Sequence, residues 1–249
     1  VPPVETPGWV VQRFAESGGR VAWYRGLAAH DLIAYDAITG PAAGTEVFIT
    51  GDEEFRPRCL TCAAGTPKGF VGQPSWHPDG ERLVIQVESS HSAHTYLNHM
   101  AWGVDNDLWI IRRDGGGAEP IWRTPRRHAA LHPHFSRDGL RLLFAERVPT
   151  GRRLPRVLAR LNQAVDGENQ WDGWRLHLAE VRTGPDGRTE LAGHRAIQPL
   201  GPGFYETHGF RDNGRIVFSF TSGGRPYVDD IYESDADGGN LQRLIDSPT

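Results

Sequence analysis

One short segment recurs along the chain, and it constrains the fold more than any other feature of the sequence. Its first copy, residues 74–86, places Pro78-Asp79-Gly80 between Trp76 and the apolar run Leu83-Val84-Ile85. Proline presets φ, aspartate bonds its own backbone and glycine accepts positive φ, so this tripeptide predicts a tight turn between two strands. Further copies occupy residues 133–144 and 208–218, with Phe135 and Phe210 in the place of Trp76. We therefore expect a repeat protein.

A second shared piece follows two of these copies. Residues 107–116 match residues 230–239, and each runs from an opening aspartate to an Asp-Gly turn. A short strand-like stretch comes next, at residues 119–123 and 241–245. One repeat unit is thus four strands. Four-stranded units with aromatic signatures at intervals of a few tens of residues are typical of the blades of a β-propeller.

The repeats predict an all-β chain with a single propeller domain over residues 20–249. The expected blades cover about residues 20–62, 72–124, 131–198 and 203–246, and residues 1–19 form an arm or a completing strand. Four blades lie at the low end of the usual range of roughly four to eight. The chain also ends where the pattern would open another blade. We therefore expect a larger propeller with further blades beyond the C-terminus.

These motifs resemble a known family of repeats. Pro78-Asp79-Gly80 before a hydrophobic strand, the turn Asp114-Gly115-Gly116 and the terminal stretch Cys59-Leu60-Thr61 are similar to the WD-like β-propeller repeats of TolB-type proteins. The resemblance covers roughly residues 30–249. It implies the propeller architecture. It implies less about activity, because such propellers serve as binding platforms, as accessory domains of enzymes and occasionally as enzymes.

Composition excludes several classes of partner and suggests export. A chain of 249 residues can bury a full core without disulfide support. Its net charge of −4 argues against a nucleic-acid or anionic-membrane partner. No apolar run approaches the ~18 residues of a membrane span. The chain begins at Val1, and its only methionine is Met100, so we expect a processed protein of the periplasm or the extracellular space.

Histidines point to one end of the propeller channel. His99 belongs to the long loop at residues 88–106, which also carries His91 and His94. The start of an inner strand and the end of a second strand meet at the same mouth of a propeller channel. We predict that the groups nearest this mouth, which we take as the ligand-binding face, include the following residues: His99, His132, His134, Glu206 and His208.

The same residues suggest a metal site. Neutral imidazoles beside a carboxylate suit zinc, manganese or a similar divalent ion, and we place such an ion at His134 and His208. The alternative is a set of hydrogen-bonded channel histidines without metal. Aligning Phe135 with Phe210 sets His208 opposite Pro133, and a one-residue shift reverses the face of an ideal strand.

The two cysteines, Cys59 and Cys62, lie three residues apart at the end of the first blade. No second pair exists to complete a four-cysteine zinc site. Two readings stay open: a disulfide across the turn that ends the strand, and two free, partly buried thiols.

The sequence contains no Gly-x-Ser-x-Gly, phosphate-loop or dinucleotide motif. Our leading hypothesis is an exported, non-enzymatic propeller that binds a partner protein or a small or saccharide ligand. One alternative is a metal-dependent, polysaccharide lyase-like enzyme that uses the channel histidines. Another is a structural subunit of a larger extracellular homo- or hetero-assembly. A divalent metal ion is the one cofactor that these residues suggest.

Overall fold

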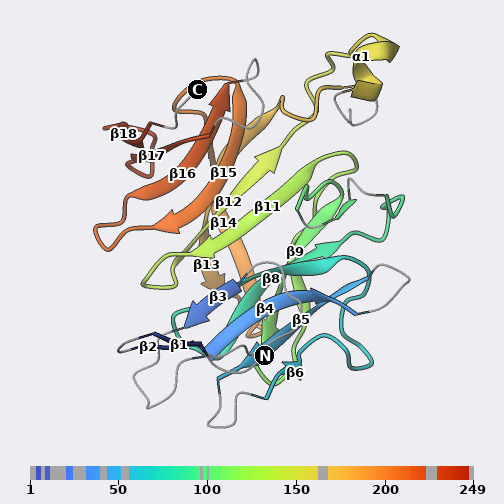
Figure 1. The fold of residues 1–249 in the computed structure, drawn as a ribbon, viewed down its shortest axis with the longest axis vertical. Helices are drawn as coiled ribbons and strands as arrows, with labels where there is room; N and C mark the ends of the chain where they lie inside the picture. The colour runs from blue at the N-terminus through green and yellow to red at the C-terminus, as the bar shows by residue number, and fades with distance from the viewer. Residues whose placement is uncertain are drawn as a thin grey trace.

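The computed structural model of the chain is nearly all β (Figure 1). It describes residues 4–6, 9–11, 21–24, 32–39, 44–51, 56–95, 98–99, 101–161, 168–222 and 229–246. Four antiparallel, four-stranded sheets follow one another along the chain. We number them as blades 1 to 4, and Figure 1 shows them in this order from blue to red. These sheets are the blades of a β-propeller.

Each blade is a meander in which consecutive strands pair. The strands of blades 1 and 2 are β3 Val21–Tyr24, β4 Leu32–Ile38, β5 Thr45–Thr50, β6 Arg58–Cys59, β7 Val71–Trp76, β8 Arg82–Glu88, β9 Asn106–Arg112 and β10 Glu119–Trp122. Those of blades 3 and 4 are β11 Ala129–Phe135, β12 Arg141–Arg147, β13 Trp174–Thr183, β14 Thr189–Ile197, β15 Gly203–Phe210, β16 Ile216–Ser222, β17 Asp230–Ser234 and β18 Gln242–Ile245.

Two smaller elements lie outside the four sheets. In the N-terminal segment, β1 Val4–Thr6 pairs with β2 Trp9–Val11, and the other residues of the expected arm lie outside the described part of the chain. The helix α1 Arg156–Leu161 forms in the insertion between β12 and β13 of blade 3, and it stands away from the sheets in Figure 1.

Three hydrophobic cores lie between successive blades. Val47, Trp76 and Ile85 belong to the core between blades 1 and 2. The core between blades 2 and 3 includes Ile110 and Phe135, and a third core joins blades 3 and 4. Among the described residues no such core joins blade 4 to blade 1. The expected further blades stay a prediction.

The repeated aromatic residues occupy equivalent positions in the three interfaces. Trp76, Phe135 and Phe210 each pair with the first core residue of the next strand, at Leu83, Leu142 and Ile216 respectively. Each ring also contacts the preceding blade. Trp76 donates a hydrogen bond to the Ala22 carbonyl, Phe135 packs against the His77 ring, and Phe210 lies under the Arg141 guanidinium. The repeat in the sequence is therefore a repeat of inter-blade contacts.

Candidate functional site

The inner strands β7, β11 and β15 are each interrupted by a bulge at the same level. Gln73 and His132 take left-handed backbone conformations there, with φ of 52° and 50°, and Gly209 has φ of 115°. The blade before supplies a side chain to each of the first two bulges. Asp36 Oδ2 accepts a hydrogen bond from the Gln73 amide at 2.9 Å, and Gln86 Oε1 accepts one from the His132 amide at 3.3 Å. Such bonds help to hold a conformation that non-glycine residues rarely adopt.

A buried polar network extends from the His132 bulge into the long loop of blade 2. Gln86 Nε2 donates to Asn106 Oδ1 at 3.3 Å. Asn106 Nδ2 donates to the carbonyls of Asn98 and Val104, at 2.7 and 2.9 Å. The side chains of Gln86, Asn106 and Asn98 are buried, so these bonds satisfy groups that water cannot reach. The loop at 88–106 is thereby tied to the start of an inner strand, as the sequence suggests.

From His132 the polar contacts continue into blade 4. His132 Nδ1 lies 2.8 Å from Glu206 Oε1, with the imidazole buried and the carboxylate largely so. The Thr207 hydroxyl donates to the His132 carbonyl, and His134 Nε2 lies 3.2 Å from the Thr207 carbonyl. Hydrogen bonds and an ion pair thus bring together three of the five predicted mouth residues.

His208 takes a different position. The bulge sets Glu206 and Thr207 level with Leu131 and His132, so His208 corresponds to Pro133 and not to His134. Its side chain is exposed, and Nε2 lies 3.2 Å from Ser219 Oγ of the neighbouring strand β16. His134 and His208 each make a hydrogen-bonding contact to a protein group of blade 4.

His99 lies beside Phe70, the residue before β7. Its ring meets Phe70 edge-on, with ring centroids 5.1 Å apart, and its Nδ1 accepts a hydrogen bond from the Ala101 amide at 3.2 Å. Burial lowers the pKa of His99, and the charge of Asp36 opposes that shift. Through Phe70, His99 lies next to the start of β7 in blade 2, whereas His132 forms the bulge of blade 3.

Aromatic side chains join the same loop to blades 3 and 4. Trp102 meets Trp171 edge-on at 5.8 Å, and Trp171 meets Phe204 at 5.1 Å. Phe204 also packs against Trp174 at 5.0 Å. Arg147, which is buried, holds the segment that carries Trp171 through an ion pair with Glu168 at 3.2 Å.

The start of β15 is anchored by Tyr205, the neighbour of Glu206. Its hydroxyl donates to the Gly201 carbonyl at 2.9 Å and accepts a hydrogen bond from the Leu200 amide at 3.0 Å. Burial raises the pKa of Tyr205 to about 12, so the phenol is neutral throughout the physiological range. A fixed Tyr205 fixes the backbone that presents Glu206.

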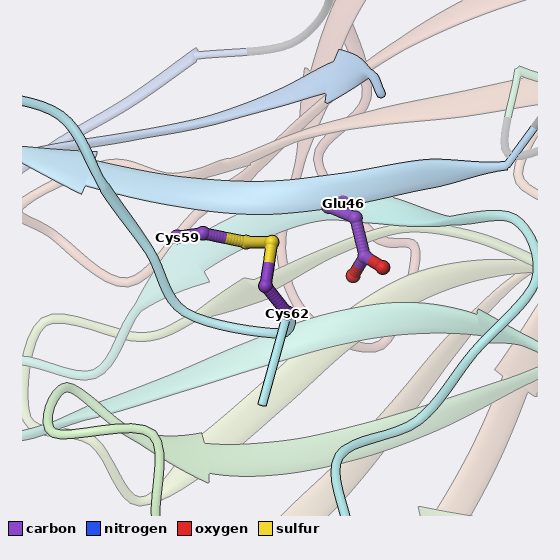
Figure 2. A group of neighbouring side chains, drawn as sticks. All are labelled: Glu46, Cys59 and Cys62. Atoms are coloured by element: carbon purple, nitrogen blue, oxygen red, sulfur yellow. A yellow bond between two sulfur atoms is a disulfide. The ribbon is translucent and has the colours of Figure 1, made fainter. Parts of the chain in front are cut away.

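The cysteines are joined in a Cys59–Cys62 disulfide at the end of blade 1 (Figure 2). The carboxylate of Glu46 lies beside it, bonded by the Thr61 hydroxyl and 3.4 Å from Lys68 Nζ. Within the described ranges this is the only group of three metal-ligating side chains with converging ligand atoms, and its sulfurs are occupied by the disulfide. A metal ion at His134 and His208 stays a prediction.

Sequence reasoning missed the residues that connect the predicted ones. Gln86 interrupts the otherwise apolar stretch of β8, and a lone amide in a buried strand is a usable signal for a polar network. Asn106, Trp171 and Phe204 give no comparable signal, because their roles depend on contacts between blades.

Comparison with solved structures identifies the class of fold. The chain is similar to the structure of a putative TolB from Agrobacterium tumefaciens, with a TM-score of 0.54 and 16% identity over 86% of this chain and 61% of that one. TolB from Acinetobacter baumannii gives 0.51 and 16%, over 86% of this chain and 41% of the other. An oligogalacturonate lyase in complex with manganese gives 0.50 and 11%, over 97% and 55%.

The fold is therefore a TolB-like β-propeller. The chain spans less than two thirds of the length of each of these three structures. No family model matches the sequence, and no curated protein matches it. In the part of the chain that the structure describes, no helix has the length and apolarity needed to cross a membrane.

Proposed function

We propose that this chain is an exported, non-enzymatic propeller that binds a partner protein or a saccharide-like ligand at its channel mouth. The observation that carries the proposal is the polar network that runs from Asn98 through Gln86 and His132 to Glu206. It crosses blades 2, 3 and 4 at one level. A satisfied buried network rigidifies the groups that it joins, and preorganised groups lose less entropy on binding.

The chemistry around this network suits recognition. Trp102 of the loop and Glu206 of the inner strand supply an indole and a carboxylate, and His134 adds an imidazole. Tryptophan is enriched in binding hot spots, and ligand contacts gather on loops held by a rigid scaffold. Aromatic faces with hydrogen-bonding groups nearby fit either a protein surface or a sugar.

The Cys59–Cys62 disulfide supports export. Disulfides persist in oxidising compartments and are rare where glutathione and thioredoxin keep thiols reduced. We therefore place the protein in the periplasm or outside the cell.

Binding measurements with matched variants test the proposed mouth. Immobilised protein is exposed to fractionated periplasmic and secreted proteins, and to an array of acidic and neutral oligosaccharides. For any ligand found, we expect Glu206→Gln and His134→Ala to weaken binding at least tenfold. Arg137→Ala is the control, because Arg137 is exposed at the opposite end of β11, where it pairs with Asp212. Loss of binding in the control but not in the mouth variants would contradict the proposal.

A metal-dependent lyase-like enzyme is the second candidate. It is favoured by the fold similarity to an oligogalacturonate lyase in complex with manganese, together with histidines at the start of the inner strands. The test is incubation with manganese and oligogalacturonate, followed by the ultraviolet absorbance of the unsaturated product. Turnover that depends on manganese and is abolished by His208→Ala would replace the binding proposal. Ligand binding without turnover would support the binding proposal.

A further inference from the structure

A second group of histidines lies away from the inner strands, between the outer strands of blade 3. His177 lies on β13 and His194 on β14, so neither belongs to the inner strands that carry the channel residues. In the strand register Ala196 is directly opposite His177, so His194 is its diagonal neighbour on the same face. His177 is buried, whereas His194 is exposed at the bulge that interrupts this strand pair.

A carboxylate orients the buried imidazole. Glu146 Oε2 lies 2.9 Å from His177 Nδ1 and also accepts a hydrogen bond from Arg175 Nε at 2.8 Å. Glu146 is buried, and the arginine balances its charge. A carboxylate at Nδ1 keeps the proton on that nitrogen and leaves the lone pair on Nε2. A carboxylate behind a histidine in this way is the usual second shell of a metal ligand.

The lone pair of His177 is directed at the second imidazole. Nε2 of His177 and Nδ1 of His194 are 3.3 Å apart. Two nitrogens bound to one tetrahedral ion at Zn–N distances of about 2.05 Å are separated by about 3.3 Å. The same separation also fits a direct hydrogen bond between the rings, so this distance suits both the metal-bound and the metal-free pair.

The surroundings suit a half-exposed ion. The Trp122 ring of β10 covers one side, with centroids 4.8 Å from His177 and 5.2 Å from His194. Exposed His194 provides the route from solvent, and water would fill the remaining coordination positions. Imidazole ligands suit zinc, copper and nickel better than calcium or magnesium.

We propose that His177 Nε2 and His194 Nδ1 form a binding site for a divalent transition-metal ion of the zinc class, with Glu146 as the residue that positions His177. This site lies near the outer edge of the interface between blades 2 and 3. It is separate from the metal predicted at His134 and His208, and it does not depend on the proposed binding function.

The test is zinc binding by purified, chelator-stripped protein. Calorimetric titration with zinc chloride should give saturable binding at one equivalent, together with a zinc-dependent rise in thermal stability. His194→Ala should abolish this saturable phase. Since His194 is exposed, this variant should keep the fold, and near-ultraviolet circular dichroism checks it. Glu146→Gln should weaken binding roughly 10–100-fold.

A control variant locates the ion. His94→Ala removes an exposed histidine that also lies beside a carboxylate, with Nδ1 2.8 Å from Glu88 Oε2, and it should bind zinc as the wild type does. Wild-type protein without saturable zinc binding, or unchanged binding in His194→Ala, would overturn the proposal and leave a hydrogen-bonded imidazole pair.

Discussion

The two ends of the inner strands can be compared blade by blade. At the end where each inner strand turns back, blades 2, 3 and 4 use the same device. The first residue of the turn donates its amide to the carbonyl of the last residue, and a glycine with positive φ lies between them at Gly80, Gly139 and Gly214. A side-chain oxygen then caps the turn, from Asp79, Asp138 or Asn213.

At the other end the blades share a bulge, but not the side chains that hold it. Asp36 binds the Gln73 amide, and Gln86 binds the His132 amide. In blade 4 the bonds run through the Thr207 hydroxyl and the carboxylate of Glu206. The turns are local and repeat because every blade needs one. The strand ends that carry the bulges differ because each faces a different neighbouring blade. We infer that the protein's function uses this end, which we call the variable end.

The largest expected effect on stability comes from the aromatic contacts that the blades share. Phe135→Ala should lower the free energy of unfolding by ~3–5 kcal/mol, because it removes a buried ring from the core between blades 2 and 3. Denaturant unfolding measures it. Phe210→Ala should cost less, since that equivalent ring is only partly buried. Equal and small losses at both positions would contradict the view that these aromatic contacts hold successive blades together.

A second variant addresses the variable end. Gln86→Ala should destabilise the protein by roughly 1–3 kcal/mol, because it removes the side-chain amide that bonds Asn106 Oδ1 and the His132 amide at a buried position. Hydrogen exchange should speed up at the His132 amide. Glu81→Ala, which removes an exposed ion pair with Arg113, is the control and should cost less than about 1 kcal/mol. Comparable losses in both variants would show that the network adds no rigidity to the mouth.

The same contrast explains what could be predicted from the sequence. Pro78-Asp79-Gly80 and the apolar run after it encode a turn and a strand through local chemistry, so the blades and the equivalence of Trp76, Phe135 and Phe210 could be foreseen. For His132 and Glu206, the sequence could predict only that the two residues lie near each other. They belong to different blades, and their ion pair depends on a bulge that no local motif indicates.

The histidine pair of blade 3 was beyond sequence reasoning for a related reason. His177 and His194 lie on strands whose register is set by a bulge, and Glu146 belongs to a third strand. Without that register, nothing in the spacing distinguishes these residues from ordinary polar positions on a strand. His134 and His208 show the opposite case, because alignment of Phe135 with Phe210 sets His208 opposite Pro133, and the strand registers agree with that alignment.

The smallest expected effect on stability comes from the carboxylates that cap the turns. The equivalent turn of blade 4, which is capped by Asn213, serves as the control. Hydrogen bonds from the Ser136 hydroxyl and the Leu140 amide hold the pKa of Asp138 below its usual value of 3.8. The unfolded chain therefore binds this proton at a higher pH than the folded chain does. The resulting stability is complete above about pH 5, and it declines as the pH falls through the ordinary pKa toward the folded one.

Asp138→Asn should remove this contribution and flatten the acid limb of the stability curve. The change should stay below about 1 kcal/mol, because the side chain is exposed to solvent. The turn itself should survive, since Asn213 caps the equivalent turn of blade 4 by accepting the Arg215 amide at 3.1 Å. Unfolding free energies measured from pH 3 to 7 provide the comparison. If the variant lost several kcal/mol at neutral pH, the turns would not be interchangeable between blades, and the contrast between the two ends would fail.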